Sequence, residues 1–294
     1  MRFGVSFVLA LGTAAMLAAP ALADTVIYNN LTPNNFMAIA TRPESAGKFE
    51  IEAGDDFLVS GGEASVNSAS FTGLIVPGTG TPSITGLVVE IYRVFPADSN
   101  VGRTSGPPTF STSQVPTRVN SPSDVAFATR NSANGLTFTT SQLAASFTAM
   151  NSVQPGGIHP MPGQTTMGNG PLTGQEVQFN VTFTTPFDLP ADHYFFVPQV
   201  EVNDGGEFYW LSADRPITGM GGTTPINPDL QAWTRDAMLD PDWLRVGTDI
   251  VDGAAPQPTF NTAFELAGTV PEPSTVVLTV TGVLALIGIR RRRS

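Results

Sequence analysis

The sequence predicts an all-β fold, an antiparallel β-sandwich of the immunoglobulin or jelly-roll kind with long Pro- and Gly-rich loops. Short segments of strand character recur along the 294 residues, and 29 Gly and 25 Pro supply dense turn signals between them. No long window shows a convincing helical period. We therefore expect residues 24–269 to form one β-sandwich domain, and the pattern leaves both topologies open.

The expected strands follow one another along the chain between these turn signals. Residues 87–95 are mostly apolar on both faces, which predicts a central strand. The clearest alternation lies in residues 176–183, where Val and Phe side chains point one way and polar side chains the other, as in a half-buried antiparallel strand. The remaining strands are expected at residues 25–28, 48–59, 64–76, 194–202, 208–212, 243–246 and 262–266.

Turns, helices and loops complete this pattern. A turn is expected at residues 53–55 inside the second strand, and Asn-Asp-Gly-Gly at residues 203–206 predicts a hairpin. Residues 141–150 and 228–239 are the best candidates for short helices. Long Pro-, Gly-, Ser- and Thr-rich loops, which favour a surface position, are expected at residues 98–124, 152–174 and 215–229.

The N-terminus has the three parts of a secretory signal peptide. Arg2 supplies the positive start, residues 5–19 form an apolar run, and Ala21 and Ala23 form a small-residue cleavage site. We therefore expect residues 1–23 to be removed and the mature chain to begin at Asp24. The chain has no cysteine, which excludes disulfides, thiolate metal sites and a cysteine nucleophile.

The C-terminus, residues 270–294, also has three parts in a fixed order. Pro271, Glu272 and Pro273 form a stiff tripeptide with few backbone N–H groups, and an uncharged apolar run covers residues 275–289. A helix over that run is about 22 Å long, short of the roughly 30 Å hydrocarbon core, which suits a transient inner-membrane anchor. The run is followed by a basic stop-transfer cluster, Arg290, Arg291, Arg292 and Arg293.

This tail resembles the PEP-CTERM sorting domain of exported proteins in Gram-negative bacteria. The resemblance implies that an exosortase-type membrane protease recognises Pro271, Glu272 and Pro273 and removes the hydrophobic tail. It also implies a destination on the cell surface or in the biofilm matrix. An ordinary C-terminal membrane anchor is the alternative. The body is similar to other PEP-CTERM proteins in the motif runs at residues 88–93, 116–122, 193–196 and 242–245.

Charge restricts the partners of the mature part. Five of the 14 Lys and Arg and one of the 25 Asp and Glu lie in the two terminal segments, which leaves 9 basic and 24 acidic residues and a formal charge of −15. Such a surface argues against nucleic acid, because phosphate binding needs a positive field. It is compatible with divalent cations and with neutral extracellular polysaccharide.

Acidic residues are the best candidates for a metal site. Asp240 and Asp242 are the preferred calcium ligands, since calcium takes several carboxylate and carbonyl oxygens from loops. The main interpretation of these residues is that they are solvated turn acids, and calcium binding is the alternative. The same two interpretations apply to Asp55 with Asp56, to Asp204 with Glu207, and to Asp249 and Asp252 in the same acidic stretch as Asp240. No D-x-[DN]-x-[DN]-G calcium loop occurs.

Catalytic signatures are few. The only histidines are His159, assigned to ordering a proline-rich loop, and His193, expected at a strand edge with a hydrogen bond to a backbone group. Neither G-x-S-x-G nor H-E-x-x-H occurs, so a Ser-His-Asp site has little support. A carboxylate pair of the glycosidase kind needs spatial rather than sequence proximity and stays open.

Aromatic and basic residues have mainly structural interpretations. Trp210 is expected in the core, whereas Trp233, in a polar stretch, is a candidate for exposure and glycan stacking. Arg93, Arg118 and Arg245 are expected to pair with acidic residues.

These observations together predict a non-enzymatic protein of the cell surface or extracellular matrix with a structural or adhesive role. The alternatives are a calcium- or polysaccharide-binding module and, third, a secreted glycan hydrolase.

Overall fold

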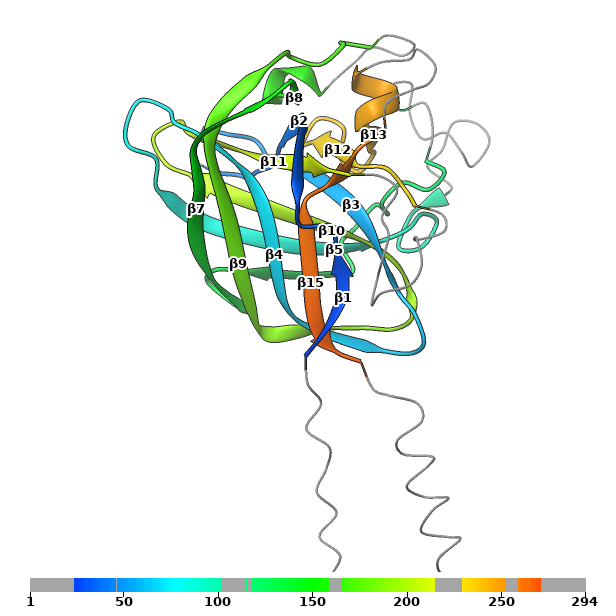
Figure 1. Cartoon of the computed structure of the whole chain (residues 1–294). Helices are drawn as coiled ribbons and strands as arrows, with labels where there is room; N and C mark the ends of the chain where they lie inside the picture. Colours follow the sequence, from blue (N-terminus) through cyan, green and yellow to red (C-terminus); the bar gives the residue numbers. More distant parts are fainter. Residues whose placement is uncertain are drawn as a thin grey trace, which may run out of the picture.

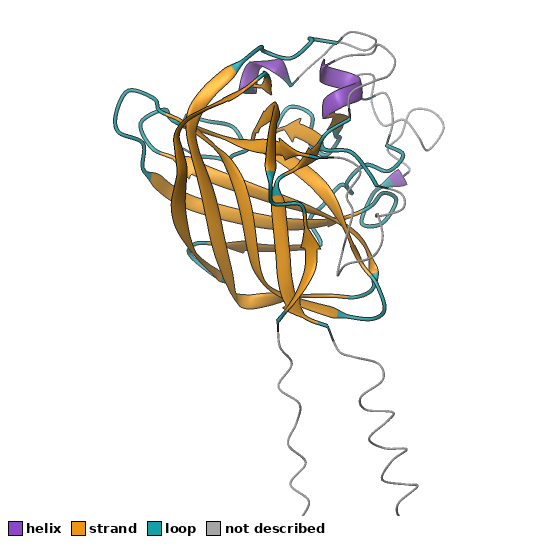
Figure 2. Cartoon of the chain, in the orientation of Figure 1, coloured by secondary structure: helices purple, strands orange, loops and turns teal. Residues whose placement is uncertain are grey.

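The computed structural model describes residues 24–45, 47–101, 115, 118–158, 165–214, 229–251 and 259–270. The expected signal peptide, with Ala21 and Ala23, and the tail from Pro271 to Arg293 lie outside these residues. Within them, no helix combines the length and the apolar character needed to cross a membrane. The chain is mostly β-strand, as predicted, and the strands form two sheets of nine and six members (Figure 2).

The larger sheet holds the long strands that face the viewer in Figure 1. β4 and β9 run side by side over most of their lengths, β7 pairs with the other edge of β9, and β15 lies between β1 and β4. Its members are β1 (Thr25–Asn29), β2 (Pro33–Ala40), β4 (Ala64–Val76), β7 (Leu136–Ala149), β8 (Asn151–Val153), β9 (Leu172–Leu189), β11 (Glu207–Ala213), β14 (Asn261–Thr262) and β15 (Phe264–Thr269).

The smaller sheet lies behind the first one in that view. Its order is β13-β12-β3-β10-β5-β6, and every neighbouring pair is antiparallel. Its members are β3 (Ile51–Val59), β5 (Ile84–Arg93), β6 (Ala128–Asn131), β10 (Asp192–Val202), β12 (Trp233–Asp236) and β13 (Leu244–Arg245). Two short helical turns, η2 (Pro155–Gly157) and η3 (Val246–Val251), complete the described elements.

Aromatic side chains fill the space between the inner faces of the sheets. Phe196 of β10 lies 5.1 Å from the ring of Phe264 and 5.9 Å from that of Trp210, both in the larger sheet. Phe71 stacks on Phe179 at 4.7 Å. All five rings are fully buried, and pairs of this geometry stabilise beyond the area that they bury.

A second apolar cluster lies on the opposite, outer face of the six-stranded sheet. It contains Tyr92, Phe195, Val197, Trp233 and Trp243, all at most 3% exposed. Segments 118–127 and 229–251 cover this face. A hydrogen bond joins the two segments, since Nε1 of Trp243 donates to the carbonyl of Ser123 at 3.1 Å. β3, β10 and β12 of the six-stranded sheet are therefore buried on both faces.

Several predicted strands are confirmed. Residues 176–183 lie in β9 with all four apolar side chains of the alternation buried. Residues 87–95 fall largely in β5, which pairs with β10 on one edge and β6 on the other, as expected of an interior strand. Residues 64–76, 194–202 and 208–212 also lie in strands.

The turn predicted at residues 53–55 is wrong, because β3 continues through Gly54 without interruption. A Cβ atom at Gly54 would approach Cγ2 of Val197 to 3.0 Å. The glycine thus permits close packing against β10 rather than a change of chain direction. Asp55 and Asp56, interpreted as turn acids, are both fully buried in this strand.

The predicted helices are also wrong where the structure describes them. Residues 141–149 belong to the strand β7, and β12 followed by a turn occupies residues 233–241. In β7, pairing with β9 decides the conformation, which the weak local preference of Ser, Gln and Ala could not reveal. β2 was missed because its first residues, Pro33-Asn34-Asn35, resemble a turn.

The prediction of a hairpin around residues 203–206 is wrong, because the strands on either side of the turn do not pair with each other. The chain does turn there, with Asp204 and Gly205 at positive φ angles of 51° and 75°. β10 and β11, however, belong to different sheets. The turn therefore carries the chain from one layer to the other.

Candidate functional site

Acidic side chains gather on the outer face of the six-stranded sheet. In β3, Ile51 and Ala53 belong to the main core, so Glu52 between them points to the outer face. In β5, Val89 and Ile91 face the core and alternate with Glu90 in the same way. The two-residue period of each strand thus places Glu52 and Glu90, which come from distant segments of the chain, on the same outer face of the sheet.

Glu50, Glu52 and Glu90 form this carboxylate cluster. One carboxylate oxygen of each lies within 4.8 Å of the other two. Tyr92 joins the cluster, since its hydroxyl lies 2.7 Å from Oε1 of Glu52 and 3.0 Å from Oε2 of Glu90. Gln199 of β10 completes it, with Nε2 3.3 Å from Oε2 of Glu90. A tyrosine hydroxyl has one proton, so it can donate to only one of the two glutamates at a time.

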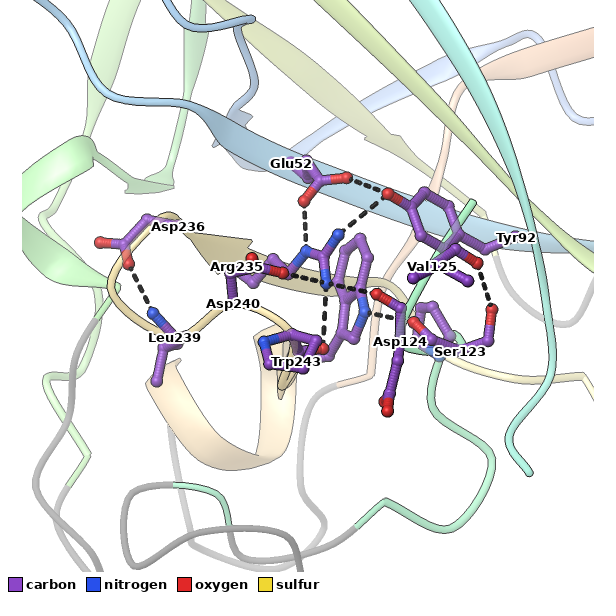
Figure 3. A network of polar contacts seen from close by, with 12 residues as sticks. Glu52, Tyr92, Ser123, Asp124, Val125, Arg235, Asp236, Leu239, Asp240 and Trp243 are labelled. Atoms are coloured by element: carbon purple, nitrogen blue, oxygen red, sulfur yellow. Dashed lines mark hydrogen bonds and ion pairs between the residues drawn. The ribbon is translucent and has the colours of Figure 1, made fainter. Parts of the chain in front are cut away.

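Among the described residues, Arg235 of β12 is the cation that forms an ion pair with this cluster, and it does so through Glu52 (Figure 3). Its Nε donates to Oε2 of Glu52, and its Nη2 donates to the hydroxyl of Tyr92 at 2.9 Å. Nη1 lies 3.1 Å from Oδ1 of Asp240 and donates to the carbonyl of Pro241 at 3.0 Å. The guanidinium therefore bonds to both side-chain and backbone oxygens while it is only 5% exposed.

Aromatic rings fix the position of the guanidinium. The Cζ atom of Arg235 lies 4.4 Å above the ring of Trp243 and 5.3 Å from that of Tyr92. The two rings meet edge to face at 5.3 Å. Cation–π attraction of this kind strengthens when the pair is shielded from water, as it is here.

Burial changes the acidity of the glutamates. Burial raises the pKa of Glu90 from 4.5 to about 7, the nearby charge of Glu52 adds to the rise, and hydrogen bonds from Thr129 and Tyr92 oppose it. Burial also raises the pKa of Glu50, again with the charge of Glu52 as the next cause. The cluster therefore holds a proton near neutral pH that an exposed set of glutamates would release.

The pKa values of Tyr92 and Arg235 shift in the direction that keeps both side chains protonated. Burial and the charge of Glu52 raise the pKa of Tyr92, so its hydroxyl keeps its proton. Burial alone would lower the pKa of Arg235, but Glu52, Tyr92 and Asp240 together outweigh it and raise that pKa. The arrangement can thus offer carboxylate oxygens to a ligand while Arg235 stays charged.

The two residues of the predicted calcium site have different surroundings in the structure. Asp240 has a side chain that is 61% exposed and lies beside Arg235, whereas Asp242 is 1% exposed. In the described residues, the acidic side chains whose oxygens lie close enough together to share one metal ion are Glu50, Glu52 and Glu90. Asp252, from the same acidic stretch, lies outside the described residues.

His193 bonds to a side chain rather than to the backbone group that the sequence predicted. Its Nε2 lies 2.6 Å from Oδ2 of Asp56, on the strand next to it. The neighbouring Asp55 faces the core, where its Oδ2 accepts from the amide of Thr262 at 2.6 Å. His159 lies outside the described residues.

One of the two tryptophan predictions is wrong, whereas the arginine predictions are confirmed. Trp210 is buried, as predicted, but Trp233 is only 1% exposed, so the expectation of an exposed ring is wrong. It packs in the outer cluster, which its polar neighbours in sequence do not reveal. The predicted arginine pairs are confirmed: Arg93 with Asp98 and Asp192, Arg118 with Asp124, and Arg245 with Asp249.

The sequence analysis missed Glu50, Glu52, Glu90, Gln199 and Arg235 as members of one cluster. A signal was present, because Glu50 and Glu52 are two residues apart, as are Glu90 and Tyr92. Polar residues at this spacing share one face of a strand.

Known proteins offer no guide to this site. No protein-family model matches the chain, and neither a curated protein nor a solved structure matches it.

Proposed function

We propose that the chain is an exported protein, sorted by its C-terminal tail, that serves a structural or adhesive role at the cell surface or in the extracellular matrix through association between copies. The observation that carries this proposal is the edge of β7. Among the described strands, β7 pairs only with β9. Residues 139–143 are exposed on both faces of the strand.

The composition of β7 favours a second copy of the chain as its partner. No Asp, Glu, Lys or Arg occurs from residue 132 to residue 175, although the mature part carries 24 acidic residues. Acidic domains repel one another, and a charge-free edge is where that repulsion is least. Edge strands are commonly protected by Lys or Pro, and β7 has neither. Its pairing with β9 is regular over residues 136–142, before two register shifts.

Apolar surface continues beyond the end of β7. Met150, which follows the strand, is 53% exposed, and Phe36 is 49% exposed. Both line a surface pocket of about 470 Å³. An edge pair would be able to bury this surface together with the unpaired backbone groups of β7.

The two ends of the domain fit attachment through the tail. Thr25 pairs with Gly268, so the described chain begins and ends at the same end of the domain, and β12 and β13 lie toward the other end (Figure 1). A domain held at residue 270 would present the carboxylate cluster away from its attachment point. If two copies paired through antiparallel β7 strands, residue 270 of one domain and residue 270 of the other would lie at opposite ends of the pair.

We also infer that the two sheets form a single large β-sandwich. The described strands exceed the seven to nine of an immunoglobulin domain and the eight of a jelly roll. Polysaccharide binding gains less support, because Trp210, Trp233 and Trp243 are all buried and are not positioned to stack on a sugar.

Replacing Glu272 with alanine is expected to block removal of the tail, because the substitution removes the charged centre of the proposed recognition tripeptide. Full-length protein should then accumulate in the membrane fraction of the native host, as measured by intact mass. Ser274→Ala, just outside the tripeptide, is the control and should be processed normally. A wild-type mass that extends to Ser294 would contradict sorting by cleavage.

Replacing Ser141 with lysine is expected to reduce self-association of the mature protein at least about tenfold, because a charged lysine on an edge strand opposes its pairing with another strand. Sedimentation velocity over a range of concentrations measures this effect. Ser60→Lys adds the same charge at an exposed position outside β7 and should leave association unchanged. A wild-type protein that stays monomeric at all concentrations would refute the edge-pairing proposal.

A further inference from the structure

The carboxylate cluster has the composition of a site for a hard cation. Glu50, Glu52 and Glu90 supply three carboxylates, and oxygens of all three lie within 4.8 Å of one another. Calcium takes six to eight oxygen ligands, from carboxylates, amide carbonyls and water. Glu50 and Glu90 are only partly buried, so water is able to complete a coordination shell.

Gln199 points to a ligand at the cluster independently of the carboxylates. Its side chain is fully buried, and its Oε1 has no hydrogen-bond partner within the part of the chain that the structure describes. Its Nε2 donates to Oε2 of Glu90 at 3.3 Å, so the amide group reaches the cluster. An unpaired buried carbonyl costs about 1–3 kcal/mol. A half-turn of the amide would point this oxygen at a cation among the glutamates.

The charges leave a deficit for a cation to fill. Arg235 offsets one negative charge, and its Nε is directed at Oε2 of Glu52. Among the described residues, neither Glu50 nor Glu90 forms an ion pair with a basic side chain, and both lie beside Glu52. A divalent cation would balance these two carboxylates and relieve their repulsion by Glu52.

We propose that Glu50, Glu52, Glu90 and Gln199 form a binding site for a divalent cation of the calcium class. The donors are all hard oxygens, which suit calcium or magnesium rather than zinc or copper. The bound ion would link β5 and β10 to the start of β3. This site lies on the opposite sheet from the β7 edge, so it depends neither on tail processing nor on self-association.

Calcium binding to the full chain, purified in a non-ionic detergent and freed of metal with EDTA, tests the proposal. Extracellular calcium sites commonly have dissociation constants of about 10⁻⁴–10⁻³ M, so CaCl₂ is titrated to about 10 mM. We expect one ion to bind by isothermal titration calorimetry and the melting temperature to rise with saturation. Absence of both effects in the folded wild-type protein would overturn the proposal.

Variants locate the ion. Glu90→Gln and, as a second variant, Glu50→Gln should each weaken calcium binding at least about tenfold, because each removes a charged ligand of nearly the same shape. Glu63→Gln, at an exposed glutamate outside the cluster, should bind as the wild type does. Loss of binding in Asp240→Asn together with normal binding in Glu90→Gln would reject this site in favour of Asp240 and Asp242. Magnesium binding that is also weakened in Glu90→Gln would confirm the site and broaden its ion class.

Discussion

Replacing Arg235 with leucine is expected to lower the free energy of unfolding by about 3–5 kcal/mol, the cost of removing one partner of a buried ion pair. The substitution leaves Glu52, which is 3% exposed, without its counter-ion. It also removes the donor to the hydroxyl of Tyr92 and the charge that packs on Trp243. Denaturation by urea at neutral pH, with EDTA present so that no cation replaces the guanidinium, measures the loss.

A surface arginine provides the control for this prediction. Arg93 pairs with Asp192, but the two side chains are 34% and 41% exposed, and such a pair is worth at most about 1 kcal/mol. Arg93→Leu should therefore cost far less than Arg235→Leu. Combining Arg235→Leu with Glu52→Leu should cost less than the sum of the two single changes, because no unpaired charge is left. Equal losses at Arg235 and Arg93 would show that the buried network contributes little.

Replacing Glu90 with glutamine is expected to stabilise the protein increasingly as the pH rises. The pKa of Glu90 is raised from 4.5 to about 7 in the folded state, so between these values the folded protein binds more protons than the unfolded chain. Stability therefore falls as the pH rises through this window, and the full penalty is present above it. The difference in unfolding free energy between variant and wild type should grow from about zero at pH 4 to about 2–3 kcal/mol at pH 8 in EDTA.

The same measurement on a glutamate outside the cluster isolates the effect. Glu63→Gln changes the same functional group at an exposed position, so its difference from the wild type should stay within about 0.5 kcal/mol over this pH range. A Glu90→Gln profile as flat as that of Glu63→Gln would show that the cluster does not destabilise the ionised carboxylate.

Sequence periodicity located strands well where one face is apolar and the other polar. Residues 176–183 in β9 are the clearest case, since the two-residue alternation states which side chains are buried. Sequence periodicity failed where contacts with distant segments decide the structure. Gly54 resembles a turn residue, yet its role is to let Val197 of β10 approach, which is visible only in the folded sheet. The residues of β7 favour no conformation strongly until β9 lies beside them.

The candidate site shows the same limit at a longer range. Glu52 and Glu90 become neighbours only because β10 brings β3 and β5 into one sheet. Arg235, far along the chain, reaches Glu52 because β12 pairs with the free edge of β3. The spacing of Glu50 with Glu52, and of Glu90 with Tyr92, predicts a shared face within each strand. It does not predict which strands meet, because that depends on sheet order.

The position of β15 has a mechanical consequence. The strand ends at Thr269 and hydrogen-bonds to β1 along one edge and to β4 along the other. A force transmitted through residue 270 therefore pulls along the strand axis and loads both ladders in shear. Hydrogen bonds loaded in shear resist together, whereas bonds pulled apart sideways break one after another. A domain attached at this point would withstand fluid drag better than one attached through a strand that can be peeled away.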